Sequence, residues 1–464
     1  MSKKWITIVL LTLILTLPGS VFSEGPGKSG YVPGEILVKF RSGVSRSSRK
    51  TAHSSHGFRL LKRFKRFQID HVKIPDGWTV EEAVAAYRLQ ADVEYVEPNY
   101  IRRANATFPN DPYFNELISP YRHEWGLHNT GQLGGTPDAD IDCPEAWDTQ
   151  TGDPNVVVAV VDSGADLDHE DLSDNIWQNT GEDWVGGSPG NNGVDDDGNG
   201  KIDDYYGWDF ENDDNDPDDD NDHGTHVSGT IGAVGDNGTG VSGVNWRVSL
   251  MVLKILDQNG NGSVLNEIRA IEYAIDNGAQ VINASFSGEA SSSLEYNAVE
   301  DAMDAGILFV AAAGNDGRDI DFPNQAAYPA GYNLANIVTV AATDRNDALA
   351  SFSNYGATSV DVAAPGVGIY STKAGDSYQY LQGTSMAAPH VSGLAALIWA
   401  EDDSLTYGQV KNRILDGVDT KSSLDGKVLT GGRINAYNSI NPPASVPDDP
   451  SLLEAEASSA SQID

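Results

Sequence analysis

Short apolar runs alternate with amphipathic stretches from about residue 107 onward. Each run is almost unbroken Val, Ile, Ala or Leu, and helical patterns such as 265–278 and 293–306 separate the runs. Strands that are apolar on both faces are typical of a parallel sheet covered by helices on its two sides. The pattern therefore predicts an α/β domain of three layers with a mostly parallel central sheet. The runs that predict its strands are NVVVAVVDSG, RVSLMVLKIL, AQVINASFSG, GILFVAAAGN and NIVTVAAT.

A different pattern occupies residues 24–106. Three segments alternate apolar and polar residues, as half-buried strands do. Before the third of them, Thr79 and Glu82 form a capping-box pattern that predicts a helix over 80–90. We therefore expect a small, separate α+β domain. Its alternating segments are GEILVKF, FQIDHVKI and DVEYVEPNY.

The two ends of the chain differ from both domains. Lys3 and Lys4 precede an apolar run, and small residues suit cleavage after Ser23, so residues 1–23 are interpreted as a secretory signal peptide. That run is too short to span a bilayer, and no later segment is long and apolar enough. Residues 442–464 are rich in Pro, Ser, Ala and acids, which predicts a disordered acidic tail. We expect a secreted, extracellular protein.

Charge is distributed unevenly along the chain. The formal net charge is −38, yet residues 24–106 hold 15 basic and 9 acidic side chains, while from residue 107 onward there are 13 basic and 59 acidic ones. So acidic a body repels nucleic acid and anionic membranes, and we expect neither as a partner. We also expect a monomer. Solubility in a salty medium and calcium binding are alternative explanations of the charge.

Four residues at the ends of predicted elements carry catalytic chemistry. Asp162 ends a buried strand, His223 opens a run of small residues, and Asn315 follows LFVAAAG. Ser385 lies in a glycine-led turn before a helical stretch, where it would attack a carbonyl while His223 takes its proton and Asp162 holds the imidazole. The Asn315 amide and the Ser385 N–H would bind the developing oxyanion. Each residue alone could be a cap or a turn residue, but all four together favour catalysis.

The segments around these residues resemble the signature blocks of the subtilisin-like serine proteases, the subtilases. The blocks are VVDSGADLDHEDL, HGTHVSGTIGA, AAAGNDG and GTSMAAPHVSG. The chain order Asp, His, Ser is similar to that family and differs from the chymotrypsin-like and α/β-hydrolase orders. The resemblance implies a subtilisin-like fold over residues 107–441 and makes His226 and His390 packing residues. Residues 24–106 resemble subtilase propeptides, which implies a self-processing precursor whose propeptide is chaperone and inhibitor.

The resemblance also implies how protein or peptide substrates bind. The family holds an extended peptide between two backbone edges, so main-chain pairing gives affinity and pockets give preference. The family's usual Ser-Leu-Gly-Gly is replaced here by a segment with Phe286 and Ser287. The small, uncharged pocket, with Asp316 at its rim, predicts a broad preference for apolar or aromatic residues before the scissile bond, with some acceptance of Lys or Arg. The substrate-binding residues are Gly260, Asn261, Gly262, Ser285, Phe286, Ser287 and Gly288 at the edges, and Ala312, Ala313, Gly314 and Ala327 at the pocket.

One acidic loop has part of a calcium-binding motif. Asp195, Asp197 and Asn199 alternate before a glycine, with Asp203 further on, which matches the first half of an EF-hand loop. Tyr206 stands where a full EF-hand has a bidentate Glu, so a full EF-hand is excluded. The alternative is a solvated acidic loop. We interpret the neighbouring run 213–222 as solvated.

A second calcium site is implied by the resemblance alone. Subtilases commonly bind structural Ca²⁺ through an early Asp, an Asp shortly after the catalytic one, and an Asn-containing loop. The matching side chains are Asp111, Asp171 and Asn237, with the carbonyls of Thr239 and Val241. All of these are hard oxygen donors, as calcium requires.

Together these features predict a secreted, calcium-stabilised serine endopeptidase made as an inhibited precursor. A non-catalytic calcium-binding or adhesion module is one rival, and the intact set of four catalytic candidates argues against it. A serine esterase is the other, and the turn at Ser385 lacks the second glycine of the G-x-S-x-G elbow.

Overall fold

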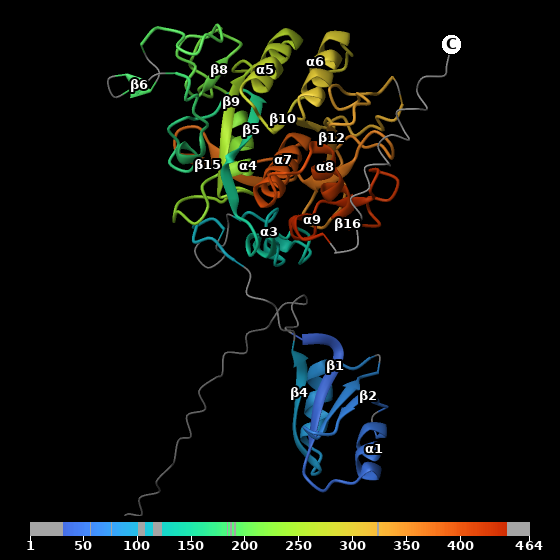
Figure 1. Cartoon of the computed structure of the whole chain (residues 1–464). Coiled ribbons are helices and arrows are strands. Elements are labelled where there is room, and N and C mark those ends of the chain that lie inside the picture. The colour runs from blue at the N-terminus through green and yellow to red at the C-terminus, as the bar shows by residue number, and fades with distance from the viewer. Residues whose placement is uncertain are drawn as a thin grey trace, which may run out of the picture. The chain divides into compact units, whose positions relative to one another are not determined.

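The computed structural model describes residues 31–55, 57–75, 77–100, 107–114, 123–182, 184–185, 188–189, 192–322 and 324–442. The predicted signal peptide and the tail beyond residue 442 lie outside these ranges. The chain forms two compact units that divide between Ala104 and Asn105 (Figure 1). Within the described ranges, no helix combines the length and apolar character that a membrane crossing needs.

The N-terminal unit is a four-stranded antiparallel sheet in the order β2-β3-β1-β4. The predicted capping box opens α2, because Glu82 N–H donates to Thr79 Oγ1 and Thr79 N–H donates to the Glu82 carboxylate. One face of the sheet buries Ile36 and Val38 against the helix residue Tyr87. The elements are β1 (Tyr31–Phe40), α1 (Arg46–Ser54), β2 (Arg59–Phe64), β3 (Ile69–Lys73), α2 (Val80–Arg88) and β4 (Val93–Tyr100).

The three predicted strands and the helix of this unit are confirmed, whereas α1 and β2 were not predicted. Helix α1, RSSRKTAHS, has hardly any apolar residue to show a helical period. Strand β2 is exposed along nearly its whole length, so its residues do not alternate between a buried and a solvated face.

The C-terminal unit is built on a nine-stranded sheet in the order β16-β17-β13-β12-β11-β10-β5-β9-β8. All neighbours are parallel except the edge pair β16–β17, so the predicted parallel sheet is confirmed. Its strands are β5 (Gly152–Asp162), β8 (Gly207–Asp209), β9 (Arg247–Lys254), β10 (Val281–Ala284), β11 (Leu308–Ala312), β12 (Ile337–Thr343), β13 (Val362–Pro365), β16 (Asp419–Thr420) and β17 (Gly432–Arg433). Two small hairpins join β6 (Trp184–Val185) to β7 (Ser188–Pro189) and β14 (Ile369–Lys373) to β15 (Ser377–Leu381).

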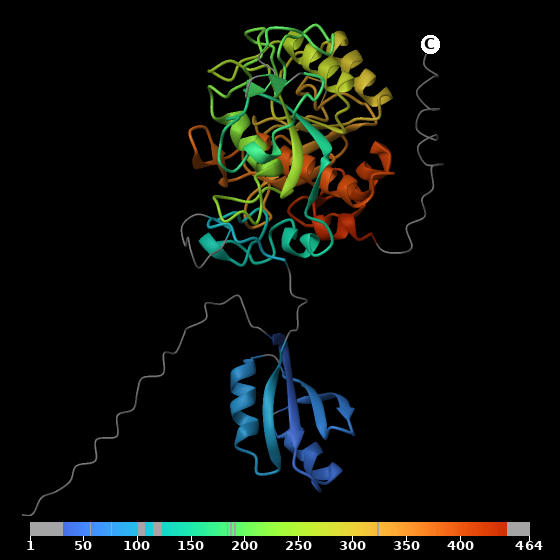
Figure 2. The same cartoon turned by 60° about the vertical axis from the view of Figure 1, so that its left-hand side comes forward.

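Helices cover both faces of this sheet, which confirms the three-layer architecture. On β5, Val158 and Val160 face one core while Ala159 and Val161 face the other. The first core includes α4 and α7, and the second includes α5 and α6, on opposite sides of the strands (Figures 1 and 2). The helices are α3 (Cys143–Trp147), α4 (His223–Gly232), α5 (Val264–Asp276), α6 (Ser293–Asp304), α7 (Thr384–Glu401), α8 (Tyr407–Asp416) and α9 (Ala436–Ile440), with short 3-10 turns η1 (Gln132–Gly134) and η2 (Ser173–Asn175).

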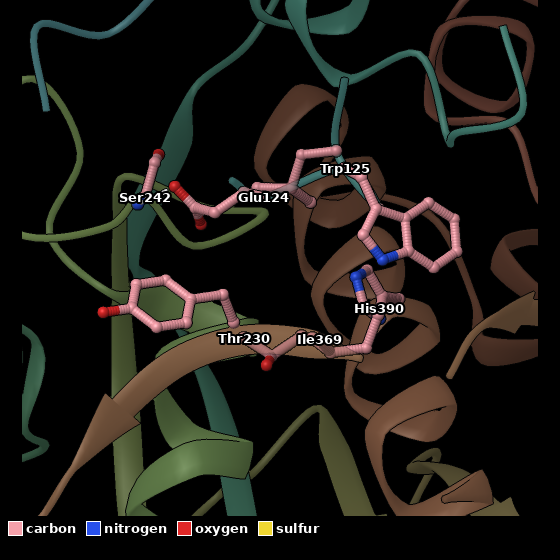
Figure 3. A pocket seen from close by; sticks show the side chains of 9 residues that line it. Glu124, Trp125, Thr230, Ser242, Ile369 and His390 are labelled. Atoms are coloured by element: carbon pink, nitrogen blue, oxygen red, sulfur yellow. Dashed lines mark hydrogen bonds between the residues drawn. The ribbon is translucent and has the colours of Figure 1, made fainter. Parts of the chain in front are cut away.

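A small internal cavity lies between α4, β14 and α7, beside the segment that carries Glu124 (Figure 3). Trp125 and His390 close one side, and Ser242 faces Glu124 from the other. None of the four predicted catalytic residues is in its lining. The cavity is therefore separate from the candidate active site.

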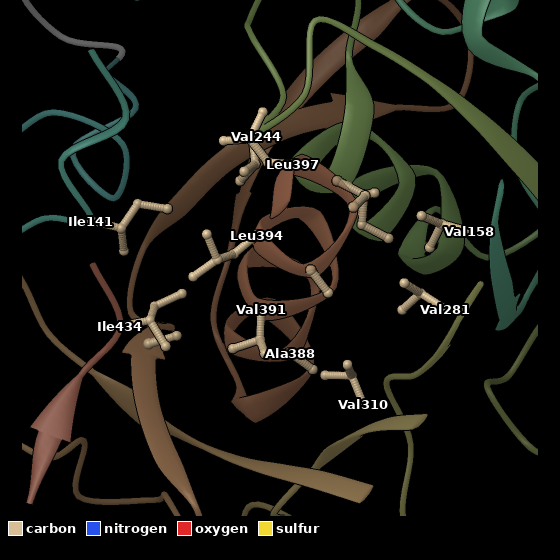
Figure 4. Packing of buried hydrophobic residues seen from close by; sticks show 14 of the residues in the cluster. Ile141, Val158, Val244, Val281, Val310, Ala388, Val391, Leu394, Leu397 and Ile434 are labelled. Carbon is tan, nitrogen blue, oxygen red and sulfur yellow. The ribbon is translucent and has the colours of Figure 1, made fainter. Parts of the chain in front are cut away.

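Helix α7 runs through the middle of the first core. Val391, Leu394 and Leu397 are fully buried and pack among residues of the sheet and of the loops around it (Figure 4). Burying one such side chain stabilises a fold by about 1.5–3 kcal/mol. The packing therefore fixes the N-terminus of α7, where Ser385 lies, relative to the sheet.

Candidate active site

Asp162 and His223 meet at the carboxyl end of β5. The Asp162 side chain is fully buried, and its Oδ1 accepts from His223 Nδ1 at 2.7 Å and from Ser163 N–H at 2.8 Å. An ionised carboxylate can only accept, so Nδ1 carries the proton and Nε2 is left as the acceptor of the ring. The His223 side chain is 26% exposed, which leaves the imidazole within reach of a substrate.

A close backbone approach explains the glycine that follows His223. A Cβ atom at Gly224 would lie 2.0 Å from the carbonyl oxygen of Gly164 and 3.2 Å from Asp162 Cβ. The first turn of α4 therefore sits directly on the turn that ends β5. Any larger residue at position 224 would push His223 away from Asp162.

Asp219 adds a second negative charge near the imidazole. Burial opposes the charged form of His223, but the charge and hydrogen bond of Asp162 and the charge of Asp219 outweigh it and raise the pKa of His223 above its ordinary value. Asp219 is nearly buried and accepts from the Thr225 N–H and hydroxyl and from the Ser163 hydroxyl. The interpretation of run 213–222 as merely solvated is therefore wrong for Asp219.

Ser385 and Asn315 come together at the start of α7. Asn315 Oδ1 accepts from Thr384 N–H at 2.8 Å, which fixes the orientation of the amide. A Cβ atom at Gly383 would lie 3.5 Å from Asn315 Nδ2 and 3.6 Å from the Ser385 backbone nitrogen. Two N–H donors thus flank one small space beside Ser385, and the glycine keeps that space open. Two N–H donors beside a hydroxyl are the groups that oxyanion stabilisation in acyl transfer would use.

A proline in α7 connects this serine to the neighbouring strand. Pro389 has no N–H, so the carbonyl of Ser385, four residues earlier, loses its helical partner. The Ser285 hydroxyl donates to that carbonyl at 2.9 Å. Ser285 directly follows β10, which is the sheet neighbour of β5. The carboxyl end of β5 therefore positions the Asp162–His223 pair, and the carboxyl end of its neighbour β10 contacts the turn that carries Ser385.

The predicted substrate-binding residues lie around the same sheet edge. Gly262 pairs with Leu256 after β9, and Gly288 exchanges two backbone hydrogen bonds with Tyr328, beside the buried Ala327. Phe286 packs against the second core. The remaining predicted residues continue these segments: Gly260 and Asn261 precede Gly262, Ser285 and Ser287 flank Phe286, and Ala312 ends β11, directly before Ala313 and Gly314.

Two features refine the predicted pocket. Gly314 has a φ of +96°, and a Cβ there would lie 2.4 Å from Asn354 Nδ2, so only glycine fits. Asp316, the predicted rim residue, has its Oδ2 3.3 Å from Arg318 Nη2, and Arg318 Nη1 also lies 3.6 Å from Glu289 Oε1. Arg318 therefore competes for the charge that was expected to attract Lys or Arg of a substrate.

The structure brings together the side chains of the site that the resemblance implies for calcium. Asp111 and Asp171 are both fully buried, and Asn237 Nδ2 donates to Asp171 Oδ1 at 2.9 Å. Asp111 accepts from the backbone of Asn237 at 3.1 Å, and Asp171 accepts from Val241 N–H at 2.8 Å. Thr239 N–H donates to Asn237 Oδ1 at 2.7 Å. Burial raises the pKa of Asp111 to about 6 and that of Asp171 to about 7.

Sequence reasoning missed a third buried acid beside this pair. Glu124, in the cavity of Figure 3, accepts from Ser242 N–H at 3.0 Å. Burial, with repulsion from Asp111 and Asp171, raises its pKa well above the ordinary value. Glu124 lies in HEWGLHNTG, which has neither periodicity nor a metal motif, so no local signal could have identified it. Glu124 therefore adds a third buried carboxyl group whose charge acts on Asp111 and Asp171 through space.

The acidic loop is arranged differently from an EF-hand. Asp195 accepts from three backbone amides of its own loop, and Asp203 accepts from two residues at the loop's start, so both close turns. Asp197 accepts from Asn199 N–H at 2.9 Å and also lies beside Glu182 and Asp204, which the loop pattern did not include. Asn199 Nδ2 donates to Asp197 at 3.0 Å.

The two other histidines of the signature blocks are buried. His226 Nε2 lies 3.0 Å from the carbonyl of Ile369, and His390 Nδ1 lies 2.8 Å from that of Met386. Burial lowers their pKa values to about 3 and about 4, so both are neutral. Their geometry is that of packing residues.

Comparison with known proteins gives the family. The model of the subtilase family (Peptidase_S8) matches residues 153–431, and that of the fervidolysin N-terminal prodomain matches residues 21–99. A thermophilic serine proteinase from Bacillus sp. (strain AK1) is 36% identical over 414 residues, 89% of this chain and 88% of that protein. Thermitase from Thermoactinomyces vulgaris is 36% identical over 332 residues, 72% of this chain and 99% of that protein. A solved protease structure from Pseudoalteromonas arctica PAMC 21717 has a TM-score of 0.57 at 30% identity and covers 72% of this chain and 99% of that chain. The chain therefore belongs to the subtilase family of serine proteases and carries an N-terminal prodomain of the fervidolysin kind.

Proposed function

We propose that this protein is a secreted endopeptidase that uses Asp162, His223 and Ser385 as its triad and Asn315 as an oxyanion donor. The observation that carries the proposal is the pair of N–H donors flanking the space beside Ser385, on the same sheet edge as the His223–Asp162 pair. A fluorophosphonate probe, which reacts with activated serines, should label Ser385 in the mature enzyme. Labelling of another serine, or none, would contradict the assignment.

The roles follow from the geometry. His223 Nε2 takes the Ser385 proton as Oγ attacks the carbonyl carbon, and Asp162 stabilises the imidazolium that forms. The carbonyl oxygen becomes an anion that Asn315 Nδ2 and the Ser385 N–H bind. His223 then gives its proton to the leaving amine, and a water molecule repeats the sequence to release the acyl group.

Substrates bind as an extended strand between the edges at 260–262 and 285–288. Main-chain pairing accepts many sequences. The pocket formed by Ala312, Ala313, Gly314 and Ala327 is small-walled and uncharged, which favours an apolar or aromatic residue before the scissile bond. The ion pair of Asp316 with Arg318 weakens the case for basic residues there.

The prodomain keeps this site inactive until it is removed. We assign residues 1–23 to the signal peptide, 24–106 to the inhibitory propeptide and 107–441 to the catalytic domain, followed by the acidic tail. We expect the propeptide to be cut from the catalytic domain between Tyr100 and Pro109, because β4, the last strand of the N-terminal unit, ends at Tyr100. The match of the prodomain model to residues 21–99 supports this boundary.

The pH dependence should report the charges around His223. Only neutral His223 can accept a proton, so kcat/KM should rise with pH through a midpoint above the ordinary histidine value of 6.5. Asp219→Asn removes one of the charges that raise this pKa and should move the midpoint to lower pH. Asp222→Asn, next to the histidine in sequence, is the matched control and should leave the midpoint in place. Equal midpoints in wild type and Asp219→Asn would show that Asp219 does not act on the imidazole.

Calcium is the structural cation that we propose for Asp111, Asp171 and Asn237, with the Thr239 and Val241 carbonyls. The buried carboxylates supply hard oxygen ligands, and a cation there compensates their mutual repulsion. A ligand bound only by the folded state stabilises it by about 2.7 kcal/mol at 100 times its Kd.

Chelation with EDTA should therefore lower the melting temperature of the mature enzyme. Asp171→Ala should reduce the rise that added calcium produces, whereas Asp174→Ala, an exposed acid on the same segment, should keep it. A melting curve that EDTA leaves unmoved would exclude a structural calcium ion.

A further inference from the structure

We propose that Glu267 and Glu295 are positioning residues of the protease site, and that one proton held between their carboxyl groups joins the segments that bind the substrate. The inference rests on the proposed function, because it concerns how the edges at 260–262 and 285–288 are held. The two side chains belong to α5 and α6, which contact each other over the second core (Figure 1). Their carboxyl groups are hydrogen-bonded to each other.

Burial prevents both carboxyl groups from being charged at once. Glu267 is 4% exposed and Glu295 is 3% exposed. The buried Oε1 of Glu267 finds no N–H or O–H donor among the described residues. A proton on Glu267 converts two repelling acceptors into a donor and an acceptor. Burial and repulsion from Glu295 accordingly raise the pKa of Glu267 well above its ordinary value.

Tyr332 keeps the remaining negative charge on Glu295. Its hydroxyl donates to Glu295 Oε2 at 2.6 Å and accepts from Ser292 N–H at 2.8 Å. A hydrogen bond from a phenol stabilises a carboxylate, and burial with this bond raises the pKa of Tyr332, so the phenol keeps its proton. Both glutamates lie in the first turn of their helices, where the positive end of the helix dipole favours one negative charge.

No basic side chain of the two helices is left to compensate a second charge. Arg269 is the basic residue of α5 and pairs with Asp213, and the sequence of α6 contains no Lys, Arg or His. The titratable side chains that act on Glu267 are Glu295 and Tyr332, and both of them disfavour its ionisation. The proton therefore does the work that a cation does in an ordinary ion pair.

The cluster connects three segments of the proposed substrate site. Helix α5 begins just after 260–262, and α6 begins shortly after 285–288. Tyr332 follows the pocket segment, in which Tyr328 exchanges two backbone hydrogen bonds with Gly288. A second negative charge would push α5 away from α6 and disturb both edges. Loss of the proton should therefore weaken peptide binding without changing the chemistry at the serine.

Stability tests the shared proton without protease activity. The full chain carrying Ser385→Ala is melted over a range of pH, with and without Glu267→Gln, whose amide donates to Glu295 but cannot ionise. Folded Glu267 keeps its proton where the unfolded chain has lost it. The parent therefore loses stability as pH rises from the ordinary value of 4.5 through the raised folded value. The gain in Tm from Glu267→Gln should grow over that range and then level off.

An exposed glutamate of the same helix is the matched control. Glu272→Gln should change Tm by an amount that does not depend on pH. If the Tm difference between Glu267→Gln and its parent is equally independent of pH, the two carboxyl groups do not share a proton and the proposal fails.

Kinetics of the mature enzyme test whether the pair positions the edges. In the wild type, KM for a long peptide should rise as pH passes through the raised pKa of Glu267, whereas Glu267→Gln should hold KM constant. Glu267→Ala removes the contact and should raise KM at neutral pH roughly fivefold, the effect of about one hydrogen bond. Glutamine should restore KM, and kcat should stay within a few-fold in both variants. If the alanine variant is not secreted, an equal rise of KM with pH in wild type and Glu267→Gln would still overturn the positioning role.

A short ester of one apolar amino acid separates this inference from the proposed function. The ester does not extend along the edges, so its KM should be the same in wild type, Glu267→Gln and Glu267→Ala. Wild-type enzyme that fails to hydrolyse both the ester and the peptide would refute the proposed function. Normal ester hydrolysis together with an unchanged peptide KM in Glu267→Ala would refute the positioning role and leave the protease assignment intact.

Discussion

Replacing Ser385 with alanine is expected to abolish casein hydrolysis and to leave the secreted chain uncut. The hydroxyl is the only group of the proposed site that forms the acyl bond, so its loss should reduce turnover about a millionfold. The same site must cleave the propeptide, so the variant should accumulate as a precursor that retains residues 24–106. Casein hydrolysis and N-terminal sequencing of the secreted protein measure both effects.

A serine on the same helix provides the matched control. Ser392 is buried two turns further along α7 and donates to Asn283 Oδ1 at 2.7 Å. Ser392→Ala should cost about 1 kcal/mol of stability through that hydrogen bond and should still mature and hydrolyse casein. Processing or activity in Ser385→Ala comparable to that of Ser392→Ala would remove Ser385 from its role.

Asn315→Ala is expected to fold and to lose roughly 100- to 1,000-fold in kcat, the usual loss for one oxyanion donor. KM should change little, because the donor contacts the oxygen strongly only when that oxygen carries charge. Steady-state kinetics on a chromogenic peptide separate the two constants.

Asn315 also accepts from Thr384, so a second variant is needed to separate its two roles. Asn315→Asp keeps the acceptor for the Thr384 N–H but loses the amide donor and adds a negative charge beside the oxyanion. It should be at least as impaired as the alanine variant. Asp316→Ala, the exposed neighbour, should stay within a few-fold of wild type. Near-normal kcat in Asn315→Asp would mean that the side chain acts by holding the turn and not by donating to the oxyanion.

The sheet and the two edges of the site could be predicted because their signals are local. An unbroken apolar run such as the one ending at Asp162 indicates a strand covered on both faces. Residues that end such runs share one edge of a parallel sheet, so Asp162 and Asn315 could be expected to lie near each other. The capping box at Thr79 is equally local, and the helix began where it predicted.

The residues that the sequence analysis missed are important because of contacts with distant segments of the chain. Asp219 stands among many acids, and only its contacts with Ser163 and Thr225 show that it is buried beside the imidazole. Glu124 and Glu182 lie far in sequence from the carboxylates that they approach. Burial at such positions depends on how distant segments pack, and a single sequence carries no local period that reports it.

The EF-hand-like pattern at 195–203 is a case in which a local motif was recognised but did not predict how its side chains are arranged. Alternation of Asp195, Asp197 and Asn199 gives the right residue types, but side chains in such a loop either close backbone turns or face a common point. In this loop both oxygens of Asp195 accept from backbone amides, whereas Asp197 accepts from one amide, Asn199 N–H, and also lies beside Glu182. Residue spacing alone did not distinguish these two arrangements.

The hydrogen bond between Ser285 and the carbonyl that Pro389 leaves free links the proposed substrate edge to the serine turn. We expect a badly fitting peptide at this edge to disturb the backbone of Ser385 through that hydroxyl. Engineering of peptide selectivity at this position will therefore change turnover as well. A redesign that aims at selectivity alone should leave Ser285 in place and alter the far wall of the pocket.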